Sequence, residues 1–495
     1  MKKPETQSLY SYIAENRVNG ELPKDFSLPR DAEPGKVQFA DGAMDGIAIY
    51  HMGMGTLDET AQKEMSALIH LISDGKTAEA DLALTDFTGK HTALSVIDPW
   101  QDYIIENRDR LQAGNLYHYG VDKLLNATKI DEVKYGMILL ELFTLQDEKV
   151  KDAVRTVGLS DEFTLFSVFI MLRWDSANDE IFELAKHVRG WGRIHAIDRL
   201  EASTQEISDW LLHEGVENWV LPAYSALTCF EKADVPGRLG KTLSHEEFSD
   251  IGKILESMLD EGPCQGISAV GDDILVEYIG HVTEQILDFA DYQRIFAFLQ
   301  HAKDNENSGL QEQCEKLLYG EECRSLVTQE VQQGEGIELA VLLGVEYGKP
   351  LLDCMEHRFD ENYHKVFYLM GEDAYADQAI ALFTRKLPLK QMQTGPAEEI
   401  GVGREYADYS KLIMIVQELK DKPGKGEQHL ETALRAPVIN NRNMALTVLE
   451  SWVEAAGKPL EDISPAMYET LLEAKQKEMV EKVRERMEKL VTCEL

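Results

Sequence analysis

Tryptophan, histidine and arginine, which can anchor a partner or hold a metal, are concentrated in residues 174–219. Four of the six tryptophans lie there with three histidines: Trp174, Trp191, Trp210, Trp219, His187, His195 and His213. Residues 186–200 carry three arginines and a lysine against a single acid, Asp198. Because tryptophan and arginine are typical interface anchors, the sequence predicts a partner-binding site at Trp191, Arg193, His195 and Arg199. The alternative is that these aromatic residues form a helical core.

The histidines of this stretch do not have the spacing of a metal site. His187 and His195 are eight residues apart across a glycine turn, and His213 belongs to a later helix. Neither an HExxH motif nor a Cys/His ligand set is present, and the six cysteines are scattered without a CxxC pair. We therefore predict no metal site and no catalytic residue.

Glycines recur among apolar residues in the segment 39–55, FADGAMDGIAIYHMGMG. A phosphate-binding loop is one interpretation, but neither GxGxxG nor GxxxxGK[ST] occurs there. Close packing eased by glycine explains the pattern better, and the sequence predicts no bound cofactor.

The elements that must position these residues are short amphipathic helices in series. Ile181, Ala185 and Val188 fall on one helical face, a GWG break follows at 190–192, and Ile194 restarts the apolar stripe. Further helix starts are indicated by capping-box patterns at Thr56 and Glu59, Ser203 and Glu206, and Ser244 and Glu247, and by Ser464 before Pro465. Residues 135–143 are apolar nearly all round, which is typical of an inner helix.

A helical hairpin with one apolar face cannot bury that face alone, so neighbouring hairpins must stack. The predicted fold is therefore all-α, an α-solenoid of stacked helical hairpins. Residues 1–55 are predicted to form an irregular N-terminal arm or cap, because prolines interrupt any helix there. A polar break near residue 303 divides the rest into two helical-repeat segments, 56–302 and 303–495, the second ending in a charged capping helix.

One spacing, RxxAxxxL, occurs at two distant places in the chain. Its members are Arg193, Ala196 and Leu200 in RIHAIDRL, and Arg442, Ala445 and Leu449 in RNMALTVL. On one helical face, a small alanine lets adjacent helices approach while leucine fills the groove. The motif resembles the second helix of HEAT repeats, so the solenoid is expected to be HEAT/ARM-like. The resemblance implies that both arginines are structural, in polar contacts between successive repeats.

The stretch HVRGWGRIHAIDRLE, together with QTGPAEEIGVGREYADYS and VINNRNMALTVLESW, also resembles a group of uncharacterised bacterial proteins, some labelled limonene hydroxylase. That label implies a terpene monooxygenase with haem, flavin or non-haem iron. The chain has no dinucleotide fingerprint, no cysteine in a haem-ligand loop and no facial triad of two histidines and a carboxylate. The resemblance therefore implies an alternative activity without assigning a catalytic residue.

The charge balance narrows the classes of partner. Fifty Lys and Arg against 88 Asp and Glu give a net charge of -38, which repels phosphate polyanions and admits basic peptides or basic protein faces as partners. A locally basic groove for duplex DNA is a weaker alternative. The N-terminus lacks the apolar region of a signal peptide, no apolar run is long enough for a membrane span, and the cysteines lack a disulfide pattern. We predict a non-enzymatic cytoplasmic scaffold that binds a protein or peptide.

Overall fold

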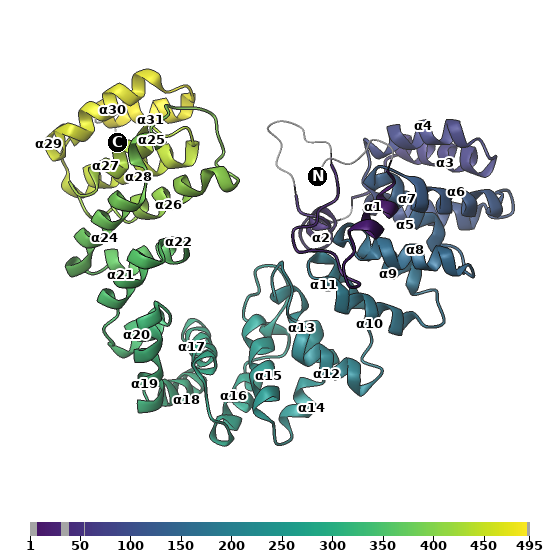
Figure 1. Ribbon diagram of the computed structural model, residues 1–495, viewed down its shortest axis with the longest axis horizontal. Coiled ribbons are helices and arrows are strands. Elements are labelled where there is room, and N and C mark those ends of the chain that lie inside the picture. Colours follow the sequence, from purple (N-terminus) through teal and green to yellow (C-terminus); the bar gives the residue numbers. More distant parts are fainter. Residues whose placement is uncertain (1–6, 31–38, 54, 493–495) are drawn as a thin grey trace. The chain divides into compact units, whose positions relative to one another are not determined.

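The computed structural model describes residues 7–30, 39–53 and 55–492, and this part of the chain is helical (Figure 1). It contains no β-strand; Val18 with Glu21 and Glu399 with Val438 form isolated bridges. The prediction of an all-α protein is confirmed. No described helix combines the length and the apolar character needed to cross a membrane.

The chain divides into two compact units. Residues 1–287 and 297–311 form the first, and residues 288–296 and 312–495 form the second. The division runs through helices α17 (Phe289–Asp304) and α18 (Ser308–Leu318). The segment boundaries predicted at residues 55 and 302 stay predictions.

In the first unit, many helices contact the next helix in the chain and also the helix after that one. The α-helices are α1 (Leu9–Asn16), α2 (Ala43–Ile47), α3 (Glu59–Ser73), α4 (Thr77–Thr88), α5 (Ala93–Glu106), α6 (Ala113–Asn126), α7 (Ile130–Glu141), α8 (Glu148–Gly158), α9 (Asp161–Met171), α10 (Ala177–His187), α11 (Trp191–Arg199), α12 (Gln205–Glu214), α13 (Ala223–Lys232), α14 (Val235–Leu239), α15 (His245–Ser257) and α16 (Asp273–Gly280). A π-helix, η1 (Ala48–Met52), continues α2, and 3₁₀ turns η2 (Ile267–Ala269) and η3 (His281–Glu284) flank α16. Thus α6 packs on α7, α8 on α9, and α10 on α11, while α9 also contacts α7 and α11.

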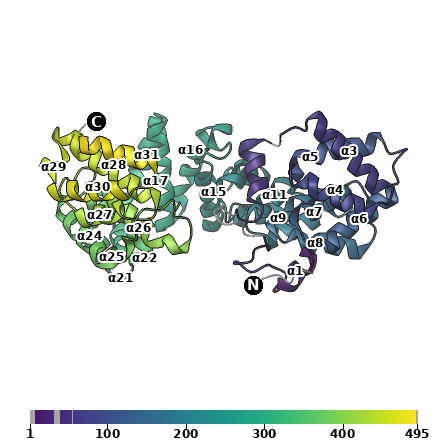
Figure 2. The same ribbon diagram turned by 90° about the horizontal axis from the view of Figure 1, so that it is seen from above.

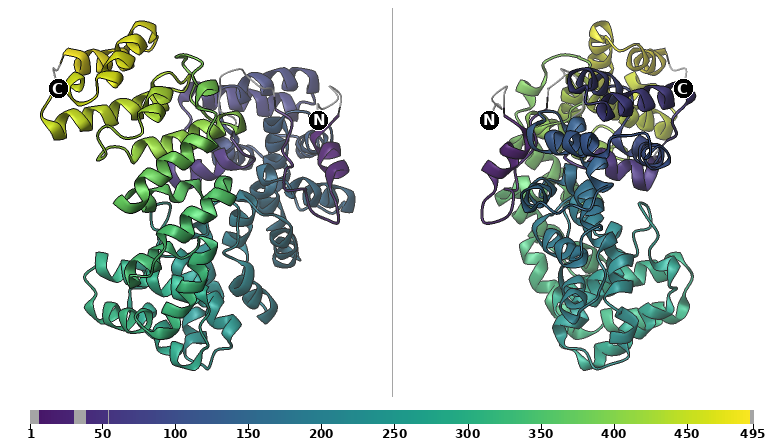
Figure 3. Two further views of the ribbon diagram at one scale, coloured as in Figure 1. Left: turned by 60° about the vertical axis from the view of Figure 1, so that its left-hand side comes forward. Right: turned by 90° about the vertical axis from the view of Figure 1, so that its right-hand side faces the viewer.

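The second unit shows the same pattern of contacts, most regularly near the C-terminus (Figures 2 and 3, yellow). Its α-helices are α19 (Glu321–Glu330), α20 (Ile337–Leu343), α21 (Gly348–His357), α22 (Phe359–Asn362), α23 (Val366–Met370), α24 (Asp373–Lys386), α25 (Leu389–Met392), α26 (Ala407–Gln417), α27 (Glu427–Leu434), α28 (Ile439–Ala456), α29 (Leu460–Ile463), α30 (Pro465–Lys477) and α31 (Glu481–Thr492). The 3₁₀ turns are η4 (Val331–Gln333), η5 (Tyr363–Lys365) and η6 (Arg404–Tyr406). Helix α28 contacts α26, α27 and α31.

Two of the predicted helix starts are confirmed in detail. Ser244 and Glu247 form a reciprocal capping box at α15, which satisfies two of the backbone N–H groups left free at a helix start. The Ser464 hydroxyl accepts from the backbone N–H of Met467, and Pro465 occupies the first position of α30.

Two other predicted caps are wrong by one or two residues. The N-cap of α3 is Asp58 rather than Thr56, and the N-cap of α12 is Thr204 rather than Ser203. The Asp58 carboxylate accepts from the N–H of Ala61 at 2.8 Å, and a carboxylate suits the positive end of a helix better than a hydroxyl.

The inner helix predicted at residues 135–143 is confirmed for residues 135–140, all buried within α7. Its neighbours α6 and α9 both pack against it. Lys134, one residue before this apolar run, is buried with it, and its partners define the site described next.

Candidate functional site

Helix α11 carries all four residues predicted to bind a partner, but it turns three of them inward. Trp191, Arg193 and His195 are 7 %, 2 % and 2 % exposed. Arg199, at the end of the helix, keeps more accessible surface, and its guanidinium lies 5.3 Å from the ring centre of Phe169. The three buried side chains belong to the core in this conformation, so only Arg199 is placed to touch a partner, and its binding role stays a prediction.

Arg193 joins α11 to the end of α12. Its guanidinium donates to the carbonyl of Glu214 at 3.0 Å and lies 5.0 Å from the ring centre of Trp210. Burial lowers the pKa of Arg193. The other members of this repeat motif, Ala196 and Leu200, are fully buried.

Arg442 has the equivalent place in the second unit and is fully buried. It donates to both carboxylate oxygens of Glu478, at 2.8 and 3.2 Å, and to three backbone carbonyls, those of Ala397, Ala436 and Pro437. Ala445 and Leu449 of the same motif are also fully buried. At both motifs, therefore, the arginine makes structural contacts within its own unit.

The remaining histidines and tryptophans of residues 174–219 have separate surroundings. His187 contacts the backbone carbonyl of Glu183, whereas His213 contacts Asp250 in α15. Burial lowers the pKa of His195 to about 3, so this ring is neutral at physiological pH. Trp219 is 55 % exposed, with the ammonium of Lys24 5.6 Å from its ring centre.

A cluster of aromatic side chains covers Trp191 and reaches the surface. Its aromatic members are Tyr50 from η1 and Tyr224 from α13, and the aliphatic Val220 packs beside them. All three are partly buried, and we call these three residues the aromatic patch. Ring centres of Tyr50 and Tyr224 are 4.8 Å apart, and those of Trp191 and Tyr224 are also 4.8 Å apart. The Tyr224 hydroxyl lies 2.7 Å from Nε2 of the exposed His51.

Two acidic side chains act on the tyrosines of this patch. Burial is the main cause of the raised pKa of the Tyr50 hydroxyl, and the charge of Asp198 adds to it. Burial also raises the pKa of Tyr224, where Asp260 adds to the effect. Both acids are exposed, but Asp198 is paired with Arg199, whose charge opposes its effect on Tyr50. The aromatic faces, with Asp260 beside Tyr224, suit a cationic side chain.

Buried ion pairs hold the segment that carries Tyr50. The ammonium of Lys134 lies 2.6 Å from Asp45 and 2.5 Å from Glu162, and Glu162 also accepts from the backbone N–H of Gly42 at 2.9 Å. Arg30 pairs with the same Glu162 carboxylate. Burial lowers the pKa of Lys134, but the two carboxylates outweigh this effect and the net pKa is raised. A lysine held in its charged form is suited to clamp the segment rather than to act as a base.

The glycines of this region permit close packing. A Cβ atom on Gly46 would lie 2.2 Å from the Trp191 ring, and one on Gly190 would lie 2.3 Å from a carboxylate oxygen of Asp161. The glycines at 42 and 46 thus bring residues 39–52 against α11, which is the packing role favoured by the sequence.

Asp161 links the start of α9 to the start of α11. One carboxylate oxygen accepts from the backbone N–H of Gly192 at 2.8 Å. Burial raises the pKa of Asp161 from 3.8 to about 7, although this hydrogen bond opposes the shift. The folded protein therefore binds a proton here more readily than the unfolded chain.

Replacing Asp161 by asparagine is expected to reduce the dependence of stability on pH. Because the folded-state pKa is the higher one, the contribution of Asp161 to stability is complete below about pH 4 and is lost as the pH rises to about 7. At about 1.4 kcal/mol per pKa unit, the loss is at most about 4 kcal/mol. Urea unfolding at several pH values should show a flatter profile for Asp161→Asn, while Asp304→Asn serves as the control. An unchanged slope between pH 4 and 7 would contradict this role.

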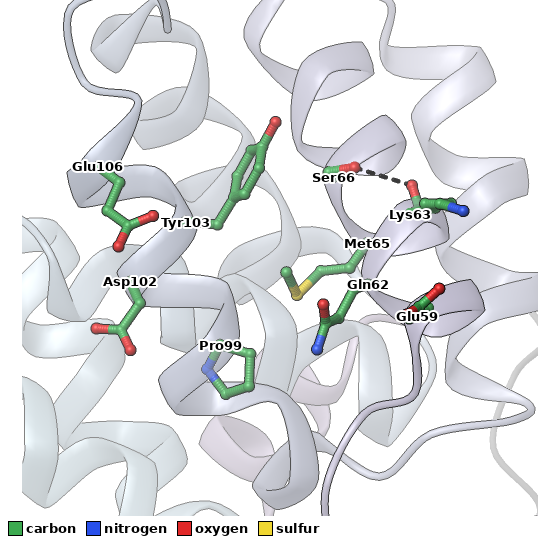
Figure 4. Close-up of a pocket in the computed structure, with 9 residues that line it drawn as sticks. All are labelled: Glu59, Gln62, Lys63, Met65, Ser66, Pro99, Asp102, Tyr103 and Glu106. Atoms are coloured by element: carbon green, nitrogen blue, oxygen red, sulfur yellow. Dashed lines mark hydrogen bonds between the residues drawn. The ribbon is translucent and has the colours of Figure 1, made fainter.

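A shallow cavity of about 530 Å³ lies between α3 and α5 in the first unit. In Figure 4, Met65 and Gln62 of α3 face Pro99 and Tyr103 of α5. Its polar lining includes the acids Glu59, Asp102 and Glu106 and the base Lys63. This lining provides an acidic groove.

The sequence did not identify Tyr50, Tyr224, Lys134 or Glu162 as site residues. They come from four separate segments. The glycine-rich pattern of residues 39–55 indicated close packing near Tyr50, and Lys134 stands directly before the apolar run of residues 135–143. Fold and site together define an all-helical protein with an aromatic, acid-flanked patch held by buried ion pairs. No known family model matches the chain, and no curated protein matches it significantly.

Proposed function

We propose that the protein is a non-enzymatic helical-repeat scaffold that binds a basic protein or peptide through the aromatic patch. The observation that carries the proposal is the patch itself, where Tyr50, Tyr224 and Val220 remain accessible above a packed floor of Trp191 and Ile194. Aromatic side chains that are well packed at the base and open to solvent are typical binding anchors.

The helix contacts support the proposed architecture, a HEAT/ARM-like α-solenoid. In such repeats each helix packs on its hairpin partner and on the equivalent helix of the next hairpin. The pairs α6 with α7 and α8 with α9, and the contacts of α7 with α9 and α9 with α11, have this arrangement. We also propose a cytoplasmic location, to which the five free cysteines among the described residues are suited.

The terpene monooxygenase alternative stays a prediction. The features described above favour binding: charged Lys134 is clamped between carboxylates, and neutral His195 is enclosed beside Trp191.

Peptide selection tests the proposal. A random peptide library is selected on the purified chain, and the affinity of the selected peptides is measured by fluorescence anisotropy. We expect sequences rich in Lys and Arg whose binding weakens by about 30-fold in Tyr224→Ala, the effect of an interface hot spot of about 2 kcal/mol. The same measurement on Arg199→Ala tests whether Arg199, which the sequence predicted to bind a partner, contributes to the peptide affinity.

Tyr319→Ala is the matched control, because Tyr319 is 57 % exposed and lies in the second unit. It should leave binding unchanged. Selected peptides that bind Tyr224→Ala as tightly as the native chain would refute a binding role for the patch.

A further inference from the structure

Three potential metal ligands converge between α12 and α15 in the first unit. Glu246 and Asp250 are four residues apart and so share one face of α15, and α12 packs against this helix and supplies His213. One ligand atom of each residue lies within 4.8 Å of the other two.

We propose that His213, Glu246 and Asp250 bind a divalent transition-metal ion such as Zn²⁺, with water completing its coordination. One imidazole and two carboxylates are a ligand set that suits such ions, and an open fourth position is common in zinc sites. The Asp250 side chain is 8 % exposed and His213 is 33 % exposed, so one ligand is fixed in the packed interface and another is open to solvent. A cation would neutralise the two carboxylates that α15 places together.

The present contacts are compatible with entry of the ion. Nδ1 of His213 lies 2.5 Å from Oδ2 of Asp250 as a hydrogen bond, whereas zinc bonds of about 2.0–2.1 Å place tetrahedral ligand atoms about 3.3 Å apart. The ring must therefore retreat by less than about 1 Å, and it is partly open to solvent. Lys253 binds Oδ1 of Asp250 at 2.7 Å, which leaves Oδ2 for the metal.

The spacing of residues along the sequence does not indicate this site, because His213 was considered there only together with His187 and His195. The structure instead pairs His213 with Asp250 and brings Glu246 close to both, and these two carboxylates are more than 30 residues later in the chain. The proposal is independent of the aromatic patch, whose residues belong to η1, α13 and the loop before it.

Zinc binding by the full chain tests the proposal. The protein is stripped with a chelator, dialysed against buffered Zn²⁺ and measured by metal analysis and calorimetry. We expect the native chain to bind one zinc ion. In His213→Ala, Asp250→Asn and Glu246→Gln, the zinc affinity should fall at least tenfold or be lost, because even the loss of a residue that only supports a ligand lowers metal affinity by about 10-fold or more. Glu246 is exposed, so its substitution leaves the fold intact and keeps the test valid if the buried variants unfold.

The matched control is His301→Ala. His301 forms a similar pair with Asp272 at 2.8 Å, whose other oxygen accepts from Asn307. This variant should bind zinc like the native chain. The proposal is overturned if the native chain binds no zinc, or if Glu246→Gln binds as much zinc, with the same affinity, as the native chain, which would place the metal on other groups such as the cysteines.

Discussion

Replacing Arg442 by methionine is expected to lower the free energy of unfolding of the second unit by about 3–5 kcal/mol. The substitution keeps a long side chain but leaves the Glu478 carboxylate buried without its cation, and three carbonyls lose their donor. Backbone N–H groups of Met479 and Val480 still donate to Glu478 at 3.0 and 2.9 Å, so the carboxylate keeps part of its stabilisation. Hydrogen exchange of α28 amides in increasing urea measures the loss.

Two variants establish that the effect comes from the buried charge. Arg486→Ala removes a partly exposed pair with Glu450 together with hydrogen bonds to Asn443 and Thr447, and should cost less than Arg442→Met. Adding Glu478→Met to Arg442→Met should recover part of the lost stability, because a buried ion pair replaced on both sides is often nearly neutral. Equal losses for Arg442→Met and Arg486→Ala would show that burial of the pair is not important.

The helices of this protein follow from local patterns that the sequence displays. Apolar residues at helical spacing predicted α10 and α11, and the all-round apolar run predicted the buried α7. The resemblance of the two RxxAxxxL motifs to HEAT repeats implied structural arginines; Arg193 and Arg442 are both buried, and their role as repeat positions stays a prediction. The N-cap residue was harder to predict where two adjacent polar residues can both cap the helix, as Ser203 and Thr204 can at α12.

The site is less predictable because it depends on contacts between distant segments. His51 and Tyr224 are 173 residues apart, and Lys134 is 89 residues from Asp45. The composition of residues 174–219 drew attention to Trp191 and His195. The neighbouring sequence does not distinguish a tryptophan buried beneath a patch, such as Trp191, from a tryptophan exposed on its surface. A lysine directly before the apolar run of α7 was the available signal for a buried ion pair, since lysine is seldom buried without a partner.

Replacing Lys134 by methionine is expected to release residues 39–53 from the helices beneath them. Methionine fills much of the space but leaves Asp45 and Glu162 buried, with Arg30 still paired to Glu162, and a broken buried pair costs about 3–5 kcal/mol. Limited proteolysis and hydrogen exchange should show the loss first in this segment. Tyr50 belongs to it, so binding at the aromatic patch should fall as well.

The position of the loss separates a local clamp from general destabilisation. If Lys134 acts as the clamp, the amides of α12 and α15 keep their protection, and adding Asp45→Asn to Lys134→Met restores part of the protection of residues 39–53, because one uncompensated charge is removed. Lys90→Met, which removes an exposed pair with Asp86, should change neither measurement. Uniform loss of protection throughout the first unit would instead assign Lys134 to the stability of the whole core, because α7 is largely buried and contacts α5, α6 and α9.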